Sequence, residues 1–319
     1  MIPLSLSTHW NASRHASGEA MVEEILSLGL NLVELGYDLR QELVPGVKAM
    51  IAQGAVRVTS VHNFCPIPVG AMRGHPEIYT PGAEDRRERE YAVTHISKTL
   101  RFAAEVGAKA VVCHSGNIDM PRYSMDLIRM AAHGEQYTEA YESLKLKAQL
   151  LRDKRAPRQL AGLEESLEKL IPVVRETGVV LALENLPTWE AIPTELESEQ
   201  LMRRFGGEGI RLWWDIGHAK IRDNMGFINS RRWLERLAPH IVGCHIHDVE
   251  PPGGDHLMPP HGNIDFNALS EWMHTDILRV LEPAPGTSLE DMTRGLALLR
   301  EAWDAPKTSN DNETKGNPQ

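Results

Sequence analysis

Residues 160–185 read LAGLEESLEKLIPVVRETGVVLALEN and contain one complete helix-to-strand unit. Apolar side chains recur at helical spacing along Leu160–Thr177, and they are Leu163, Leu167, Leu170, Ile171 and Val174. Gly178 follows, and glycine is the residue that most often ends a helix. The next stretch, Val179–Leu183, is a short apolar run that predicts a buried strand. This unit predicts a helix that returns the chain to a parallel sheet.

The same alternation recurs along the chain. Helical patterns cover Gly18–Leu28 and Arg86–Val106, and a last helix is expected after Ser288, its predicted N-cap. The short apolar runs are Ile2–Ser7, Leu32–Leu35, Val56–Val61, Ala110–Cys113, Val179–Leu183, Ile210–Trp214, Ile241–Ile246 and Ile277–Leu281. Eight such units predict an α/β fold, a single (β/α)8 TIM barrel over residues 1–304. A doubly wound open sheet is the alternative, but residues 7–13, STHWNAS, lack its glycine-rich phosphate turn.

Two connections are long, and both leave the carboxyl ends of predicted strands. Residues 63–85 are rich in proline and glycine. Residues 117–158 form an α-helical insertion after strand 4, with one polar helical pattern from about Tyr123 to Arg152. The insertion is either a tolerated surface addition or a lid or oligomer contact. Residues 305–319 have too little apolar content to fold, which predicts a disordered tail.

Composition and charge narrow the class of protein. The 319 residues are 42% hydrophobic and 24% charged, as in a globular protein with a sizeable core. The 34 lysines and arginines against 44 acidic residues give a net charge of −10, which argues against a nucleic-acid partner. Three widely spaced cysteines indicate a reducing compartment and a cytoplasmic location. No apolar run is long enough for a membrane span, and MIPLSLSTHW at the start is expected to hold the first strand rather than a signal peptide.

Ionisable side chains stand at or just after the ends of six predicted strands. They are His62, His114, Glu184, Asp215 with His218, His245 with His247, and Glu282. In a barrel these strand ends open at one mouth, so the side chains should converge there. Carboxylates brought together without a partner would repel one another or take up protons. A divalent cation would resolve this, and the mixture of imidazole and carboxylate suits Zn²⁺ or Mn²⁺.

Five motifs together resemble a known family. They are LALEN at 181–185, WWDIGHA at 213–219, CHIHD at 244–248, DHLMPPHGNIDF at 255–266 and LEP at 281–283. In order and spacing they resemble the xylose isomerase-like TIM-barrel superfamily. That superfamily includes sugar and sugar-phosphate isomerases and epimerases, and the type IV apurinic (AP) endonucleases. The resemblance covers all eight predicted strands and leaves out the insertion and the tail.

The epimerase branch of this superfamily implies a site of one metal ion. Its ligands would be Glu184, Asp215, His245 and Glu282. By resemblance, Glu184 and Glu282 would also move a proton next to a carbonyl through a metal-stabilised enediolate, and His218 would contact a substrate oxygen. The expected protein is a metal-dependent sugar or sugar-phosphate isomerase or epimerase of carbohydrate metabolism. Substrate-binding candidates are His9, Trp10, His62, His114 and His247.

Other activities on the same scaffold stay open. The endonuclease branch, a zinc-dependent phosphodiester hydrolase, implies additional metal ligands, and the matching residues are His62, His114, His218 and His256. One ligand position of that branch holds Gly254 here, with Asp255 one residue out of register, and Arg73 is the only lysine or arginine of the 63–85 connection. A metal-dependent dehydratase of a polyol or sugar acid and a noncatalytic sugar-binding protein are further alternatives. A homo-oligomer is compatible with the sequence.

Overall fold

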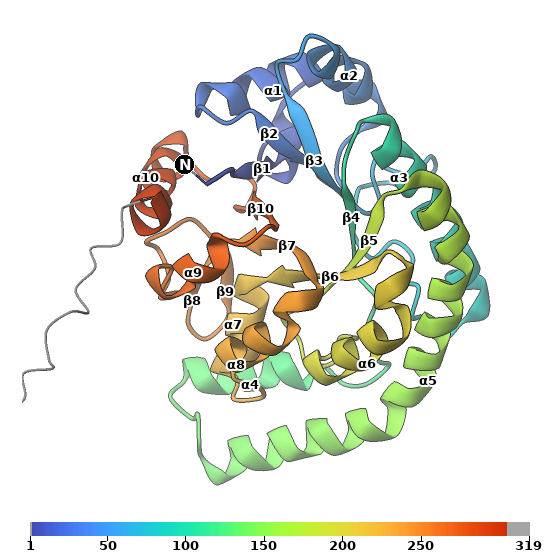
Figure 1. Cartoon of the computed structure of the whole chain (residues 1–319). Helices are drawn as coiled ribbons and strands as arrows, with labels where there is room; N and C mark the ends of the chain where they lie inside the picture. Colours follow the sequence, from blue (N-terminus) through green and yellow to red (C-terminus); the bar gives the residue numbers. More distant parts are fainter. Residues whose placement is uncertain (1, 305–319) are drawn as a thin grey trace, which may run out of the picture.

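The computed structural model describes residues 2–304, and its centre is a closed barrel of eight parallel strands (Figure 1). Around the barrel the strand order is β1-β10-β7-β6-β5-β4-β3-β2, so the last strand pairs with the first. The strands are β1 Ser5–Ser7, β2 Leu32–Leu35, β3 Arg57–His62, β4 Ala110–Cys113, β5 Val180–Glu184, β6 Ile210–Asp215, β7 Ile241–Ile246 and β10 Leu278–Leu281. Each predicted run overlaps one of them, and β3, β5 and β6 each extend one residue beyond the predicted end, which confirms the TIM barrel. The predicted tail, 305–319, lies outside the described residues.

Helices surround the barrel. They are α1 Gly18–Ser27, α2 Val44–Ala52, α3 Arg86–Glu105, α4 Tyr123–Ala132, α5 Glu139–Thr177, α6 Glu195–Phe205, α7 Ile216–Asn224, α8 Ser230–Leu237, α9 Ser270–Met273 and α10 Leu289–Asp304. Ser288 accepts a hydrogen bond from the Asp291 amide at 3.0 Å, which confirms it as the cap of the last helix. No helix within residues 2–304 is both long and apolar enough to cross a membrane.

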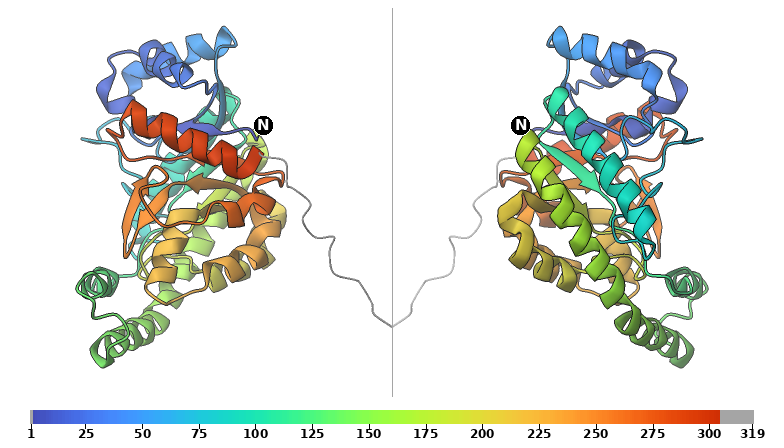
Figure 2. Two further views of the ribbon diagram at one scale, coloured as in Figure 1. Left: turned by 90° about the vertical axis from the view of Figure 1, so that its left-hand side faces the viewer. Right: turned by 90° about the vertical axis from the view of Figure 1, so that its right-hand side faces the viewer.

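The insertion differs from its prediction. The single helical pattern expected over Tyr123–Arg152 is wrong, because the chain turns between α4 and α5 at Gly134 and Tyr137, both with positive φ. Thr138 then caps α5 by accepting the Tyr141 amide at 3.3 Å. From there α5 runs without a break into the predicted helix Leu160–Thr177, through Pro157. Figure 2 shows α4 and the first part of α5 projecting from one side of the barrel.

The strands separate two apolar layers. Alternate residues point inward, and the interior cluster is Ala110, Val112, Ala182, Trp213 and Val280. Trp214, the next residue on β6, packs instead in the larger cluster beneath the helices. Gly243 on β7 makes room for the inward indole, because a Cβ there would lie 2.2 Å from the ring of Trp213. One end of the interior is therefore filled, and polar side chains occupy the other.

An antiparallel hairpin, β8 Asp248–Glu250 and β9 Gly254–Leu257, follows β7. Asp248 organises the turns after it, because its carboxylate accepts the amides of Val249, Gly262 and Ile264 at 2.8–3.0 Å. This structural role accounts for the final aspartate of the CHIHD motif. The hairpin carries His256 to the mouth of the barrel, where its Nδ1 lies 3.0 Å from the Glu282 carbonyl oxygen.

Candidate metal centre

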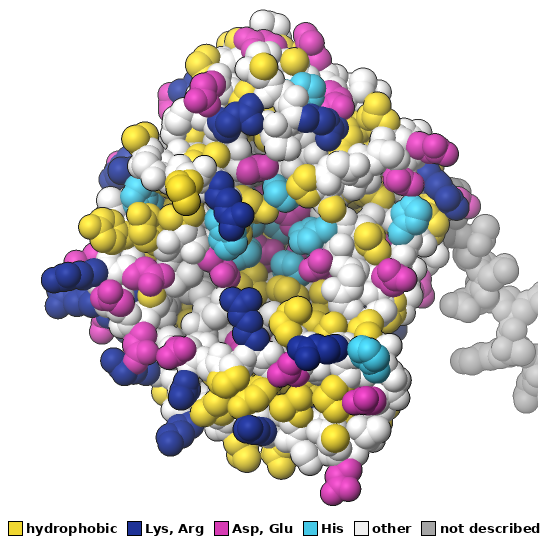
Figure 3. Space-filling view, turned by 180° about the vertical axis from the view of Figure 1, so that it is seen from behind, with side chains coloured by type: hydrophobic (Ala, Val, Ile, Leu, Met, Phe, Trp, Pro, Cys, Tyr) yellow, Lys and Arg dark blue, Asp and Glu magenta, His cyan; other side chains and the backbone are white. Residues whose placement is uncertain are grey.

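A cavity of about 680 Å³ opens at the carboxyl ends of the strands. Figure 3 shows histidine and acidic side chains gathered on the floor of this hollow. Those from the strand ends and the segments that follow them are His62, His114, Glu184, His218, His256 and Glu282. The insertion supplies part of the wall, with Asn117, Ile118, Asp119, Met120, Arg122 and Met125. The insertion is therefore part of the site and not a remote surface addition.

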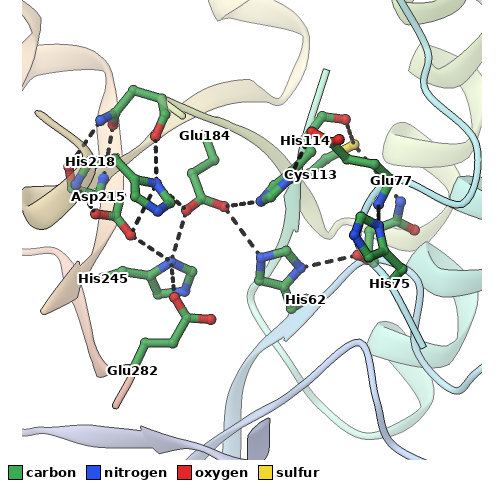
Figure 4. Close-up of polar contacts among 12 residues, drawn as sticks. His62, His75, Glu77, Cys113, His114, Glu184, Asp215, His218, His245 and Glu282 are labelled. Atoms are coloured by element: carbon green, nitrogen blue, oxygen red, sulfur yellow. Dashed lines mark hydrogen bonds and ion pairs between the residues drawn. The ribbon is translucent and has the colours of Figure 1, made fainter. Parts of the chain in front are cut away.

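Four of the predicted residues form one buried group, named here the quartet: Glu184, Asp215, His245 and Glu282. Each offers a ligand atom within 4.8 Å of the others. His245 Nδ1 lies 3.1 Å from both Glu184 Oε1 and Glu282 Oε2, and 3.6 Å from Asp215 Oδ2 (Figure 4). All four residues are at most 3% exposed. Their predicted convergence is confirmed by this geometry.

Backbone and side-chain bonds hold two members of the quartet in place. Asn185, which follows Glu184 in the LALEN motif, ties the end of β5 to β6 by bonding both the amide and the carbonyl of Asp215 at 2.9 Å. Asp215 is also the N-cap of α7 and accepts the His218 amide at 2.6 Å. In WWDIGHA, Asp215 both ends β6 and caps α7, and the imidazole of His218 follows within one helical turn.

The carboxyl groups of the quartet differ in acidity. Burial alone would raise the pKa of Glu184, but the charges of His245 and His114 outweigh it and hold the pKa well below its ordinary value. The pKa of Asp215 is likewise lowered, because the neighbouring histidines outweigh burial. The pKa of Glu282 is raised by burial and by the negative charges of Glu184 and Glu34, against the opposing effect of His245. The same surroundings therefore lower the pKa of one glutamate and raise the pKa of the other.

The donor set fits a divalent cation. Within residues 2–304, no lysine or arginine pairs with the three carboxylates of the quartet. Buried Glu184 Oε2 makes no hydrogen bond in the described chain, although His62 Nε2 and His114 Nε2 lie 3.3 and 3.2 Å away. Carboxylates this deeply buried need a compensating positive charge. Oxygen and imidazole ligands at this spacing suit Zn²⁺ or Mn²⁺.

Three histidines around the quartet have their ring protons fixed by the backbone. His62, His218 and His256 place Nδ1 at 3.0–3.1 Å from the carbonyl oxygens of Asn63, Asn185 and Glu282, respectively. A carbonyl can only accept, so Nδ1 carries a proton, and in the neutral ring Nε2 keeps its lone pair. This arrangement is the one that metal-ligating histidines commonly use. A second ligand group, His62, His114 and Glu184, brings its ligand atoms within 4.8 Å of one another.

His247 has a different role from the one predicted. Its Nε2 lies 3.0 Å from Asp215 Oδ1, and its Nδ1 accepts the His256 amide at 2.9 Å. Both ring nitrogens are thus engaged, and the side chain is completely buried, so a substrate contact is not available to it. Instead His247 orients Asp215. Gly217 allows this approach, because a Cβ there would lie 2.0 Å from the His247 ring.

Two other substrate-binding candidates lie away from the floor of the cavity. Trp10 is completely buried, and its indole N–H donates to the Thr287 carbonyl at 2.8 Å, so the substrate contact expected of it is wrong. His9 contacts Asp38 and the hydroxyl of Tyr37 at 3.1 and 3.0 Å, so it reaches the cavity only through Tyr37, which lines it. His62 and His114 do line the cavity, as expected.

Sequence reasoning missed two glutamates. Glu34, in β2, is completely buried, with Oε1 3.1 Å from His245 Nε2. Its signal was a charged residue inside the apolar run LVEL, which is costly unless it has a partner. Glu77, in the connection between β3 and α3, lies with Oε1 3.4 Å from His114 Nδ1. No local pattern marks a loop residue of this kind.

Comparison with known proteins assigns the family. The family model of the xylose isomerase-like TIM barrel matches residues 22–277, and the chain belongs to this family. A curated relative, the uncharacterized protein MJ1614 of Methanocaldococcus jannaschii, is 24% identical over 244 residues, which are 76% of this chain and 77% of that protein.

Similar solved structures support the same fold. The 3-keto-D-glucoside 4-epimerase YcjR from E. coli is 18% identical, with 94% of this chain and 99% of that chain covered and a TM-score of 0.67. A D-tagatose 3-epimerase-like protein is also 18% identical, with 94% and 96% covered and a TM-score of 0.68. An L-ribulose 3-epimerase is 17% identical, with 95% and 89% covered and a TM-score of 0.62.

Proposed function

We propose that this protein is a metal-dependent isomerase or epimerase that moves a proton at the carbon beside a carbonyl of a carbohydrate-like small molecule. The observation that carries the proposal is the buried quartet, in which Glu184 and Glu282 flank His245. Three structurally similar proteins are named as sugar epimerases or epimerase-like, which supports the same class of reaction. Zn²⁺ or Mn²⁺ is the cation that the ligand chemistry favours.

The two glutamates divide the proton transfer. Glu184 and Glu282 each lie 3.1 Å from His245 Nδ1, and in the proposed reaction one of them accepts a proton from the substrate while the other donates one. Such a pair can take a proton from one side of a carbon and return one on the other. His218 keeps the Nε2 lone pair free, because Asn185 binds its Nδ1–H, and it can accept a substrate hydroxyl. A cation held by the quartet would polarise the substrate carbonyl.

The lining of the cavity supports a neutral polyhydroxy substrate. Beyond the strand ends, its acidic members are Glu77, Glu84, Glu88, Asp119 and Glu190. Arg122 is the one lysine or arginine among the described lining residues. Phosphate binding generally relies on several cationic or backbone N–H donors. An unphosphorylated sugar therefore fits this lining better than a sugar phosphate.

Solvent exchange tests the reaction directly. Metal-loaded protein is incubated with a panel of free ketoses and aldoses in D2O, and proton NMR follows the C–H group beside the carbonyl. We expect deuterium to enter at that carbon while the epimer or isomer forms. Glu184→Gln and Glu282→Gln should lose the exchange, and the control Glu197→Gln, which contacts Arg152 and not the quartet, should keep it. Metal-loaded wild-type protein that exchanges none of the panel would contradict the proposal.

A zinc-dependent phosphodiester hydrolase of the type IV AP endonuclease kind is the second candidate. The fixed tautomers of His62, His218 and His256 favour it, because a quartet alone does not need three more imidazole lone pairs. The acidic lining and the net charge of −10 oppose a DNA substrate. Cleavage of a duplex with an abasic site, lost in His62→Ala, would shift the assignment to this activity.

The cytoplasmic location and a homo-oligomer stay predictions.

A further inference from the structure

A carboxylate stands behind His245, on the side of the ring that faces away from the quartet. Glu34 Oε1 lies 3.1 Å from His245 Nε2, whereas the other ring nitrogen, Nδ1, faces Glu184 and Glu282. Glu34 and His245 are both completely buried. The imidazole of His245, on β7, therefore lies between Glu34, on β2, and the carboxylates of the quartet.

Glu34 is held firmly in this position. Its second oxygen, Oε2, accepts the hydroxyl of Ser60 at 2.7 Å. Ser60 is directly opposite Glu34 in the pairing of β2 with β3 and is also completely buried. The carboxylate is thus fixed by a neighbouring strand on one side and presents its other oxygen to His245.

This arrangement sets the tautomer of His245. For Nδ1 to offer a lone pair to a cation among the carboxylates, the ring proton must be on Nε2. Glu34 Oε1, 3.1 Å from Nε2, accepts the hydrogen bond from this N–H group. Metal-ligating histidines commonly donate their second N–H to such a carboxylate, which orients the ring and makes the ligating nitrogen more basic.

The aromatic neighbours of His245 fix the plane of its ring but still allow the ring to turn over within that plane, and Glu34 opposes this rotation. The ring of His62 is stacked on that of His245, with centroids 5.7 Å apart and planes at 6°, and Trp213 packs by its edge at 5.2 Å. These contacts fix the plane of the ring. A half turn about the Cβ–Cγ bond keeps that plane but exchanges Nδ1 for a carbon atom. It would also leave the buried Oε1 of Glu34 without its donor, which is costly.

We propose that Glu34 is a positioning residue of the metal centre, holding His245 in the tautomer and ring orientation that present Nδ1 to the cation. The inference rests on the proposed function only in requiring that the quartet binds a divalent cation. It predicts that changes at Glu34 weaken metal binding without touching any ligand. A purely structural hydrogen bond would affect the stability of the metal-free protein and leave its metal affinity unchanged.

Metal affinity distinguishes these roles. The dissociation constants of Zn²⁺ and Mn²⁺ are measured by competition with a chromophoric chelator, for the full-length wild-type, Glu34→Gln and Glu34→Ala proteins. Loss of an outer carboxylate commonly weakens metal binding about 10- to 100-fold. Glu34→Gln, whose amide oxygen can still accept the Nε2–H, should fall at the low end of that range, and Glu34→Ala at the high end.

The matched control is Glu197→Gln, which changes another buried glutamate that pairs with Arg152 and accepts the Thr194 amide at 2.7 Å. It should lower the melting temperature of the metal-free protein and keep the wild-type metal affinity. If Glu34→Ala does not fold, Glu34→Gln carries the test. Wild-type affinity in the folded Glu34 variants would overturn this inference alone. Wild-type protein that binds neither metal would overturn the quartet and the proposed function with it.

Discussion

Removing the cation from the quartet should lower the thermal stability of the barrel. Glu184, Asp215 and Glu282 bring their ligand atoms within 4.8 Å of one another. Two unit charges at that distance repel by about 3.5 kcal/mol at an effective dielectric constant of about 20, so three ionised carboxylates would cost about 10 kcal/mol. That sum is comparable to the whole stability of a folded domain. In the metal-free protein the neighbouring histidines offset part of this repulsion, since their charges lower the pKa of Glu184 and Asp215, whereas the pKa of Glu282 is raised.

The expected size of the effect follows from binding linkage. A ligand present at about 1,000 times its dissociation constant stabilises the fold by about 4 kcal/mol. For a chain of this size each kcal/mol shifts the melting temperature by about 2 °C, so the loaded protein should melt about 8 °C above the chelated one. Scanning calorimetry with excess Zn²⁺ or Mn²⁺, and separately with a chelator, measures the difference. Glu184→Gln should lose most of it. Equal melting temperatures for loaded and chelated wild-type protein would refute the reasoning.

Three further predictions concern single residues. Glu282→Gln should stabilise the chelated protein at neutral pH. The folded state raises the pKa of Glu282, so ionisation of this carboxyl costs folding stability as the pH rises above its unfolded pKa. Urea unfolding should show a higher free energy of unfolding for the variant without metal and a lower one with metal present. Glu24 has its pKa lowered to about 2 by Arg14 and other partners that outweigh burial, so Glu24→Gln should cost about 1 kcal/mol at neutral pH, after allowance for solvent screening. That cost should disappear as pH falls from about 4.5 to about 2, and a constant difference across this window would contradict it. Gly243→Ala should destabilise the fold by about 1–3 kcal/mol, since the added methyl meets the Trp213 ring, and unchanged urea unfolding would count against this packing.

The strands and the quartet could be predicted because each is marked locally in the sequence. A short apolar run ends in an ionisable residue at Glu184, Asp215 and Glu282, and the barrel topology then places those ends at one mouth. The spacing of the five motifs indicated the same strand ends. Both the apolar runs and the motifs can be recognised without knowing which side chains contact one another.

The remaining features depend on contacts between distant parts of the chain. Glu34 and His245 are 211 residues apart, and no pattern in either segment names the other. Trp10 follows the first strand, as a substrate contact would, but its indole finds a carbonyl 277 residues away and is buried there. The continuity of α5 escaped prediction because no local pattern joins the insertion to the helix expected at Leu160–Thr177, and Pro157 lies between the two, although the structure carries the helix through it.

The most direct test of the metal centre is the metal content of each chain. The protein is purified without chelator or metal-affinity resin and analysed by elemental mass spectrometry, beside Glu184→Gln and Asp215→Asn. We predict at least one Zn²⁺ or Mn²⁺ per wild-type chain and its loss from both variants. Wild-type protein that holds no divalent metal, even after reconstitution with Zn²⁺ and Mn²⁺, would contradict the account.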